Sequence, residues 1–167
     1  DTLYEDAAGL IEALCPGKPV HFVGLSMGGF VGMRLAARKP QLLKSLVLLD
    51  TSADPEPNRL KYLLLNQVCG WGGAKLVSDK VIRILFGKSS LEDPSKKSIL
   101  ERWKRTIENH PRNITKAVAG VIYRKGIYEE LSQINTKTLV AVGDEDVATT
   151  PAKAERIHQA ISNSQFK

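Results

Sequence analysis

Three short apolar runs divide the chain, at residues 20–25, 46–49 and 139–142. They lack the regular apolar and polar alternation of a half-exposed strand. Apolar runs of this length are typical of strands that are buried on both faces of a parallel sheet. We therefore expect three parallel strands, and we expect the first run to have a neighbouring strand on each side.

Helical patterns lie between and beside these runs. Residues 2–14 open with a capping box and then carry apolar side chains at helical spacing as far as Pro16-Gly17. A helix-forming run at residues 31–38 follows the first strand, and Thr150 with Pro151 marks the start of a helix after the third. Strands that alternate with helices predict an α/β fold built from right-handed βαβ units.

The segment between the second and third strands is far longer than a crossover requires. It begins with a proline-broken loop at residues 53–57. Glycines and prolines then separate the helical patterns of this segment. These patterns predict helices at residues 60–68, 74–86, 95–109 and 113–124.

The length of 167 residues, of which 43% are hydrophobic, suits one ordinary domain. We expect an α/β core in two parts, residues 1–57 and 136–167, and a helical insertion at residues 58–135. No apolar run approaches the ~18 residues of a membrane span, and the acidic N-terminal residues are unlike a signal peptide. Cys15 and Cys69 lie far apart without metal-ligand spacing, which predicts two buried, reduced thiols. These features together predict a soluble, cytoplasmic protein with no membrane partner.

The net charge of +6 is concentrated in the middle of the chain. Residues 58–137 contain sixteen Lys and Arg against seven Asp and Glu. The densest basic group, at residues 96–105, shares its predicted helix with several acidic residues, which favours a solvated helix face over a nucleic-acid site. We therefore expect no nucleic-acid partner, and at most a weak attraction for anionic substrates.

The most informative motif follows the first predicted strand. Gly24, Ser26 and Gly28 have the spacing G-x-S-x-G, between a predicted strand and a predicted helix. A serine on such a sharp turn is lifted out of the sheet, and only small residues fit two positions before and after it. The motif is neither G-x-G-x-x-G nor a Gly-Lys-Ser/Thr loop, which argues against phosphate binding. A structural turn with an incidental serine is the alternative.

Residues 24–29, Gly-Leu-Ser-Met-Gly-Gly, resemble the nucleophile elbow of α/β-hydrolases, in particular the esterase, enol-lactonase and perhydrolase-like branch. The resemblance continues in order through residues 46–50 and 138–146. It implies that Ser26 is a nucleophile, that the Met27 N–H stabilises an oxyanion, and that a carboxylic ester or lactone is the substrate. It also implies that the helical insertion is a cap over the active site, and that no cofactor or metal takes part. A serine at this position argues against the dehalogenases and epoxide hydrolases of the same fold.

Three acidic residues, at positions 144–146, follow the third predicted strand. The C-terminal end of a strand in an open α/β sheet is where catalytic groups lie, and the order serine then acid is that of α/β-hydrolase triads. The pattern of the resembled family places the triad acid at Asp146, with Asp144 as the second choice. Glu145 is expected to face solvent.

A triad also requires a histidine, and the three present do not match the family's position. We expect His21 to be structural, His110 to lie in a turn of the insertion, and His158 to be a surface or packing residue in a helix. The resemblance places the triad histidine after one further strand, beyond Lys167, and the second oxyanion donor in a loop before these residues. The chain thus resembles a partial α/β-hydrolase fold, truncated at both ends.

Two further alternatives remain open from the sequence. The aromatic residues of the insertion either line a substrate pocket or form the insertion's own core; they are Trp71, Phe86, Trp103 and Tyr123. In place of an enzyme, the chain could be a non-catalytic, hydrolase-like module that forms a homo-oligomer through unpaired sheet edges.

Overall fold

Residues 2–167, which the computed structural model describes, divide into two units. The first unit comprises the residues up to Asp54 together with Gly126–Asp144 and Thr149–Lys167. The second unit comprises Pro55–Lys125 and the short segment Glu145–Ala148.

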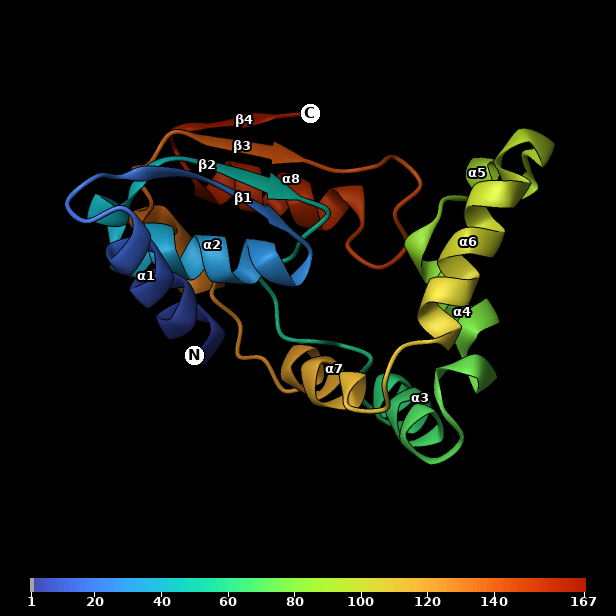
Figure 1. Ribbon diagram of the computed structural model, residues 1–167. Helices are drawn as coiled ribbons and strands as arrows, with labels where there is room; N and C mark the ends of the chain where they lie inside the picture. The colour runs from blue at the N-terminus through green and yellow to red at the C-terminus, as the bar shows by residue number, and fades with distance from the viewer. Residues whose placement is uncertain (1) are drawn as a thin grey trace. The chain divides into compact units, whose positions relative to one another are not determined.

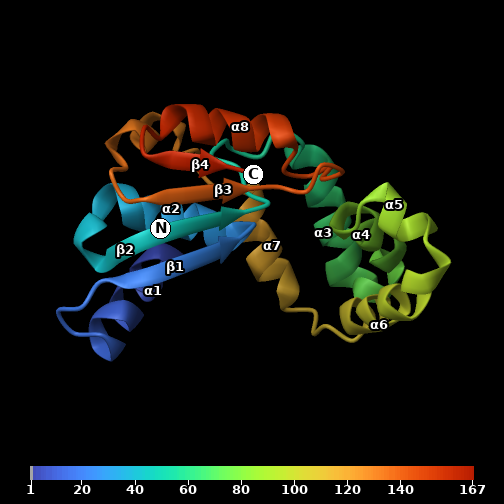
Figure 2. The ribbon, with the colours of Figure 1, turned by 90° about the horizontal axis from the view of Figure 1, so that it is seen from above.

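A parallel sheet forms the centre of the first unit. Within the described residues its strand order is β1-β2-β3-β4, and each neighbouring pair is parallel. Figure 2 shows β1, β2 and β3 side by side and running in one direction. The strands are β1 (Val20–Leu25), β2 (Leu43–Leu49), β3 (Thr138–Ala141) and β4 (Ser164–Phe166).

Helices α1 (Thr2–Leu14), α2 (Met27–Arg38) and α8 (Pro151–Ala160) lie on one side of this sheet (Figure 1). Helix α2 packs against β1 and β2, α8 packs against β3, and α1 packs on α2. The α/β architecture with a parallel sheet, predicted from the apolar runs, is confirmed.

The core of the first unit lies between the sheet and its helices. Leu46 and Leu48 of β2, Met33 and Leu35 of α2, and Ile157 of α8 are almost completely buried. Burial of such side chains is the dominant favourable contribution to folding. It holds the C-terminal ends of β1 and β2 beside the start of α2, which is where the G-x-S-x-G motif lies.

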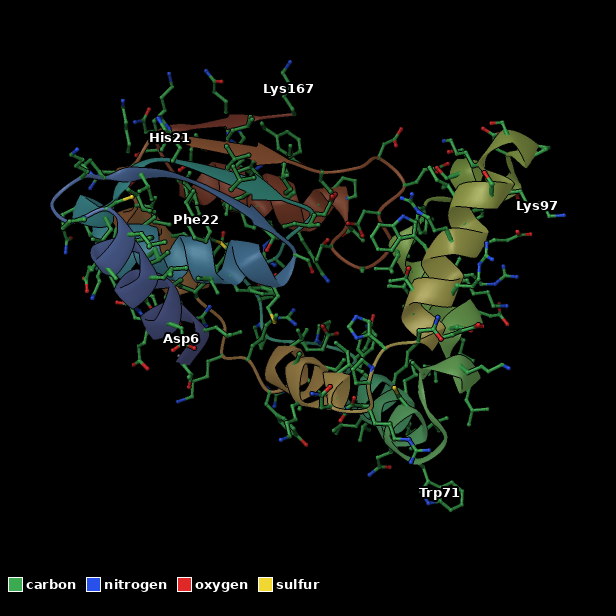
Figure 3. All side chains as sticks on the ribbon, in the orientation of Figure 1. Asp6, His21, Phe22, Trp71, Lys97 and Lys167 are labelled. Carbon is green, nitrogen blue, oxygen red and sulfur yellow. The ribbon has the colours of Figure 1, made fainter. Side chains whose placement is uncertain are left out.

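Strand β1 lies at the edge of the sheet within the described residues, in agreement with the unpaired sheet edge expected of a partial fold. Among residues 2–167 it pairs with β2 alone. Phe22 points toward α2 (Figure 3), where its ring lies against Gly32. Val23 and Leu25, which alternate with Phe22 along the strand, are 63% and 60% exposed. Within these residues, the apolar composition of the first run therefore does not correspond to burial on both faces.

Strand β4 was not among the predicted strands, because no apolar run marks it. Tertiary contacts with α8 fix its position. The Ser164 hydroxyl donates to the Ile161 carbonyl at 2.7 Å and lies 2.7 Å from Nδ1 of His158. Phe166 stacks on the His158 ring at a centroid distance of 5.7 Å. His158 thus has a packing role at the junction of α8 and β4.

The second unit is helical, and its helices follow the predicted patterns closely. The pattern at residues 74–86 is divided into a 3₁₀ turn, Ala74–Leu76, and α4. The short α5 lies between two predicted helices and had no periodic pattern of its own. The helices are α3 (Arg59–Gly72), α4 (Ser78–Leu85), α5 (Lys88–Glu92), α6 (Lys97–Glu108) and α7 (Ile114–Ile122).

The core of the second unit is small. Cys69, Ala74 and Val77 are buried together, and Ile107 and Ile114 pack against them. A buried ion pair adds to this core: Arg124 Nη1 lies 3.2 Å from Glu56 Oε2, and both side chains are at most 10% exposed. The pair connects the segment before α3 with the end of α7.

The aromatic residues of the insertion do not form its core. Trp71 is 91% exposed and stands out from α3 in Figure 3. Trp103 and Tyr123 are also exposed, and Phe86 is half-buried. The core alternative is therefore wrong for Trp71, Trp103 and Tyr123, because small aliphatic residues fill the space between the helices. A role for these rings in a substrate pocket stays a prediction.

Both cysteines are free: Cys69 is buried, whereas Cys15 is only half-buried. None of the helices in the described part of the chain combines the length and the apolar character that a membrane crossing demands.

Candidate active site

Ser26 occupies the sharp turn between β1 and α2. Its backbone angles are φ 49° and ψ −111°, a conformation that non-glycine residues rarely adopt. The Ser26 N–H still donates to the Leu49 carbonyl at 2.9 Å and so continues the pairing of β1 with β2. Ser26 itself is exposed, and its side chain makes no capping hydrogen bond to α2. The motif therefore presents a hydroxyl at the C-terminal edge of the sheet, on a strained backbone.

The close approaches at this turn involve Gly24 and Gly29 rather than Gly28. A Cβ atom at Gly24 would lie within 3.0 Å of the Gly28 backbone. A Cβ atom at Gly29 would lie equally close to the side chain of Thr51. Around Gly28 there is open space. A small residue is therefore sterically required two positions before the serine, as expected, but not two positions after it. On the helix side of the turn, the packing requires a glycine one position further along, at Gly29.

Thr51 forms a contact with the elbow that sequence reasoning missed. It lies just after β2 and is 1% exposed. Its Oγ1 donates a hydrogen bond of 2.8 Å to the carbonyl oxygen of Ser26. The same oxygen accepts the Gly29 N–H at 2.9 Å. The sequence did contain one signal for Thr51. It is a polar residue close behind an apolar strand, at the edge of the sheet where catalytic groups are expected.

Met27 is the first residue of α2. The first N–H groups of a helix have no acceptor within it, and they lie at the positive end of the helix dipole. The Met27 N–H is therefore free of intrahelical bonding, directly beside the Ser26 hydroxyl in the chain. An N–H in this position can stabilise negative charge that develops on a substrate oxygen.

A second strained residue, Asp50, ends the neighbouring strand β2. Among the described residues, Ser26 and Asp50 are the non-glycine residues with positive φ, which is 43° at Asp50. The Asp50 N–H donates to the Ala141 carbonyl at 3.0 Å, and its Oδ1 accepts the Gly143 N–H at 2.9 Å. Asp50 therefore joins the C-terminal ends of β2 and β3, immediately before the acidic loop. In the sequence, Asp50 appeared only as the last residue of the resembling segment 46–50, after the apolar run, and had no predicted role.

The acidic loop itself is divided between the units: Asp144 belongs to the first and Asp146 to the second. Asp144 is exposed. Asp146 is half-buried, and its Oδ1 accepts the Ala148 N–H at 2.7 Å. Burial raises the pKa of Tyr62 in the second unit, and the Glu56 and Asp146 carboxylates add to the rise. Asp146 thus lies close enough to Tyr62, in its own unit, to raise the pKa of that residue.

Glu145 was expected to face solvent; it is half-buried, and its carboxylate is bonded to a neighbouring helix. Its carboxylate accepts hydrogen bonds from the Ser89 N–H, at 2.9 Å, and from the Ser89 hydroxyl, at 2.7 Å. These bonds hold the pKa of Glu145 below its ordinary value. The residue fixes the acidic loop to the start of α5, within the second unit.

The family model for the alpha/beta hydrolase fold matches residues 1–167. The chain belongs to the alpha/beta hydrolase fold family.

Solved structures with the same architecture include several hydrolases. The chain matches a hydrolase from Pseudomonas aeruginosa with a TM-score of 0.84 and 26% identity, over 99% of this chain and 61% of the other. It matches a thermophilic esterase from Thermogutta terrifontis with a TM-score of 0.85 and 26% identity, over 98% and 61%. The enol-lactonase of Burkholderia xenovorans has the same fold, with a TM-score of 0.85 and 23% identity over 99% and 62%.

A curated relative is a Rhizobium rhizogenes protein that bears the name carbamate hydrolase RutD. It is 23% identical over 147 residues, which are 87% of this chain and 56% of the relative. The chain therefore spans about three fifths of the length of the hydrolases that it matches.

Two histidines of the first unit are bonded to serines other than Ser26. His21 Nδ1 lies 2.6 Å from the Ser45 hydroxyl on the adjacent strand, and His158 pairs with Ser164. His110, in the second unit, is exposed in the turn after α6. The structure therefore brings together Gly24, Ser26, Met27 and Gly28 in one unit, with Asp146 in the other.

Proposed function

We propose that this chain is part of a serine hydrolase that acts on carboxylic esters or lactones. The observation that carries the proposal is the exposed Ser26, held at φ 49° between a parallel strand and the start of a helix. Strained backbone at an exposed nucleophilic side chain is typical of functional sites. Membership of a hydrolase family supports the same reaction class.

In the proposed reaction, the Ser26 hydroxyl attacks the carbonyl carbon of the substrate and loses its proton to a histidine base. The Met27 N–H donates to the oxyanion of the tetrahedral intermediate. Asp146 orients the histidine and stabilises its positive charge. The histidine then protonates the leaving alcohol, and water releases the acyl group by the same steps in reverse order.

Two relatives support an ester or lactone as the substrate class. The matched Thermogutta protein is an esterase, and the matched Burkholderia protein is an enol-lactonase. The name of the Rhizobium relative adds carbamates to the substrates that should be tested. Because the second unit is inserted between the strands that bear Ser26 and the acidic loop, we infer that it acts as a cap and selects the acyl group.

The test uses the protein at its full natural length. We expect a fluorophosphonate probe to label Ser26, and p-nitrophenyl acetate, a γ-lactone or a carbamate ester to be hydrolysed. Ser26→Ala should abolish the labelling and lower kcat by at least about 10⁴-fold. Mass spectrometry of the labelled peptide and steady-state kinetics measure the two effects.

Acid variants complete the experiment. Asp146→Asn should lower kcat by roughly 10²-fold or more, whereas Asp144→Asn should leave it within about threefold. A large loss of kcat in Asp144→Asn together with a small one in Asp146→Asn would make Asp144 the triad acid. Absence of labelling, together with turnover equal to that of Ser26→Ala on every substrate, would reject the serine hydrolase.

A second candidate function follows from β1. This strand has an unpaired edge among the described residues and two exposed apolar side chains, Val23 and Leu25. Unpaired apolar edges favour pairing with another chain. The alternative is a non-catalytic, hydrolase-like module that associates with a second copy of itself through this edge.

A further inference from the structure

We propose that Thr51 is a positioning residue that aims the Met27 N–H at the oxyanion. This inference deepens the proposed function and rests on it. Thr51 lies 25 residues from Ser26 in the sequence, just after β2, yet its hydroxyl donates to the Ser26 carbonyl at 2.8 Å. Thr51 is 1% exposed, so its hydroxyl is shielded from water on its own side of the bond.

The peptide group between Ser26 and Met27 links this bond to the chemistry. The peptide is planar and trans, so its C=O and its N–H point in opposite directions. Fixing the Ser26 carbonyl therefore fixes the direction of the Met27 N–H. Thr51 and the Gly29 N–H, which donates at 2.9 Å, both hold that carbonyl. The two donors prevent the peptide plane from rotating about its flanking bonds.

The strain at Ser26 explains why such a restraint is needed. With φ 49° and ψ −111°, Ser26 lies outside the broadly allowed regions, where relaxation of the backbone is favourable. Such relaxation would turn the Ser26–Met27 peptide away from its present direction. Two hydrogen bonds to one oxygen oppose it, and donation to the carbonyl also polarises the N–H of the same peptide.

Packing places the Thr51 hydroxyl in this position. A Cβ atom at Gly29 would lie within 3.0 Å of Oγ1, Cβ and Cγ2 of Thr51. The threonine side chain therefore lies flat against the first turn of α2, and the absence of a side chain at Gly29 makes room for it. Leu49, two residues before Thr51, accepts the Ser26 N–H at 2.9 Å, so both ends of the Ser26 residue are bonded to the same segment.

The test compares three variants of Thr51 in the full-length protein. Thr51→Val keeps the shape and removes the hydroxyl, Thr51→Ser keeps the hydroxyl and removes the methyl group, and Thr51→Ala removes both. If the hydrogen bond aims the oxyanion donor, Thr51→Val and Thr51→Ala should lower kcat by about tenfold to a hundredfold and leave KM within about twofold. Thr51→Ser should keep kcat within about threefold of the wild-type value. Affinity for a boronic acid transition-state analogue should fall in parallel with kcat.

A packing role predicts the opposite order, because the isosteric valine would then be the mildest change. A greater loss of kcat in Thr51→Ser than in Thr51→Val would therefore overturn the inference. Thermal unfolding identifies any variant that does not fold. If Thr51→Val does not fold, Thr51→Ala serves as the variant without a hydroxyl.

Amide hydrogen exchange at Gly29 tests the inference without any activity. The Gly29 N–H should exchange faster in Thr51→Val than in the wild type or Thr51→Ser, because the shared Ser26 carbonyl is less firmly held. If Ser26 proves unreactive, the proposed function fails while this measurement still decides the role of Thr51. Equal exchange in all variants would refute the positioning role.

Discussion

At the residue scale, the elbow depends on a few close backbone approaches. Gly24 and Gly29 lie where a Cβ atom would collide with neighbouring atoms, whereas Gly28 has open space around it. The packing therefore requires a glycine at the first end of the G-x-S-x-G spacing but not at the second. The first glycine allows the strand to pass the helix, and Gly28 has no such steric need.

Replacement of these glycines by alanine should separate the two cases. We expect Gly24→Ala to lower the free energy of unfolding by about 2–3 kcal/mol, because its Cβ would force the strand and helix apart. Gly28→Ala should change the free energy of unfolding by less than about 0.5 kcal/mol, because alanine suits a helix and meets no neighbour. Urea unfolding followed by circular dichroism gives both values. Similar losses for the two variants would contradict the steric difference.

At the element scale, contacts between distant segments hold α2 in place. Arg38, at the end of α2, donates two hydrogen bonds of 2.7 Å to the Glu130 carboxylate. Glu130 lies in the 3₁₀ helix η4 (Tyr128–Gln133), which also packs on α2. This bidentate bond holds the pKa of Glu130 below its ordinary value. The elbow helix is thereby fixed at its far end as well as at Ser26.

The lowered pKa gives this contact a defined pH dependence. The folded state binds the Glu130 proton less tightly than the unfolded state, so the pair stabilises the fold above the ordinary pKa of 4.5. The contribution is lost as the pH falls through the lowered folded-state value. Glu130→Gln should therefore lower the free energy of unfolding by about 1 kcal/mol at neutral pH, an amount reduced by the partial exposure of the pair.

Urea unfolding of wild type and variant across the acidic range measures this difference. The two free energies should converge as the pH falls through the lowered pKa of Glu130 in the folded state. Glu129→Gln, at the exposed neighbouring position, is the matched control and should remain close to the wild type throughout. A Glu130→Gln deficit that persisted unchanged at low pH would show that the carboxylate charge is not its cause.

At the scale of the whole molecule, exposed apolar surface on the first unit bears on the second candidate function. The side chains of Val23 and Leu25 are more than half exposed, and β1 has no partner on its outer edge within residues 2–167. Edge strands of this kind pair readily with other chains.

We expect the 167-residue chain to self-associate in the micromolar range, and Val23→Lys to weaken the association at least about tenfold. A lysine on the edge strand adds charge repulsion and removes apolar surface. Leu3→Lys, at a half-exposed position on α1, is the control and should have little effect. Sedimentation velocity measures the association constants. A wild-type chain that remained monomeric throughout would exclude the self-associating module.

Much of the fold and the central motif could be predicted from the sequence alone. Apolar runs and helical periodicity placed β1, β2, β3 and the main helices, because these patterns reflect which faces a regular element buries. The spacing of Gly24, Ser26 and Gly28 located the elbow, because so tight a turn leaves a local signature. These are properties of neighbouring residues, which a sequence records directly.

Only the tertiary structure showed which distant residues within each unit are bonded to one another. The Thr51 hydroxyl donates to Ser26, the Gly143 N–H donates to Asp50, and Ser89 donates to Glu145. Each of these bonds joins residues that are far apart in the chain. The position of strand β4 was likewise decided by its pairing with β3. Hydrogen bonds of this kind depend on the relative placement of whole elements, which the burial of the shared core determines and which no local pattern encodes.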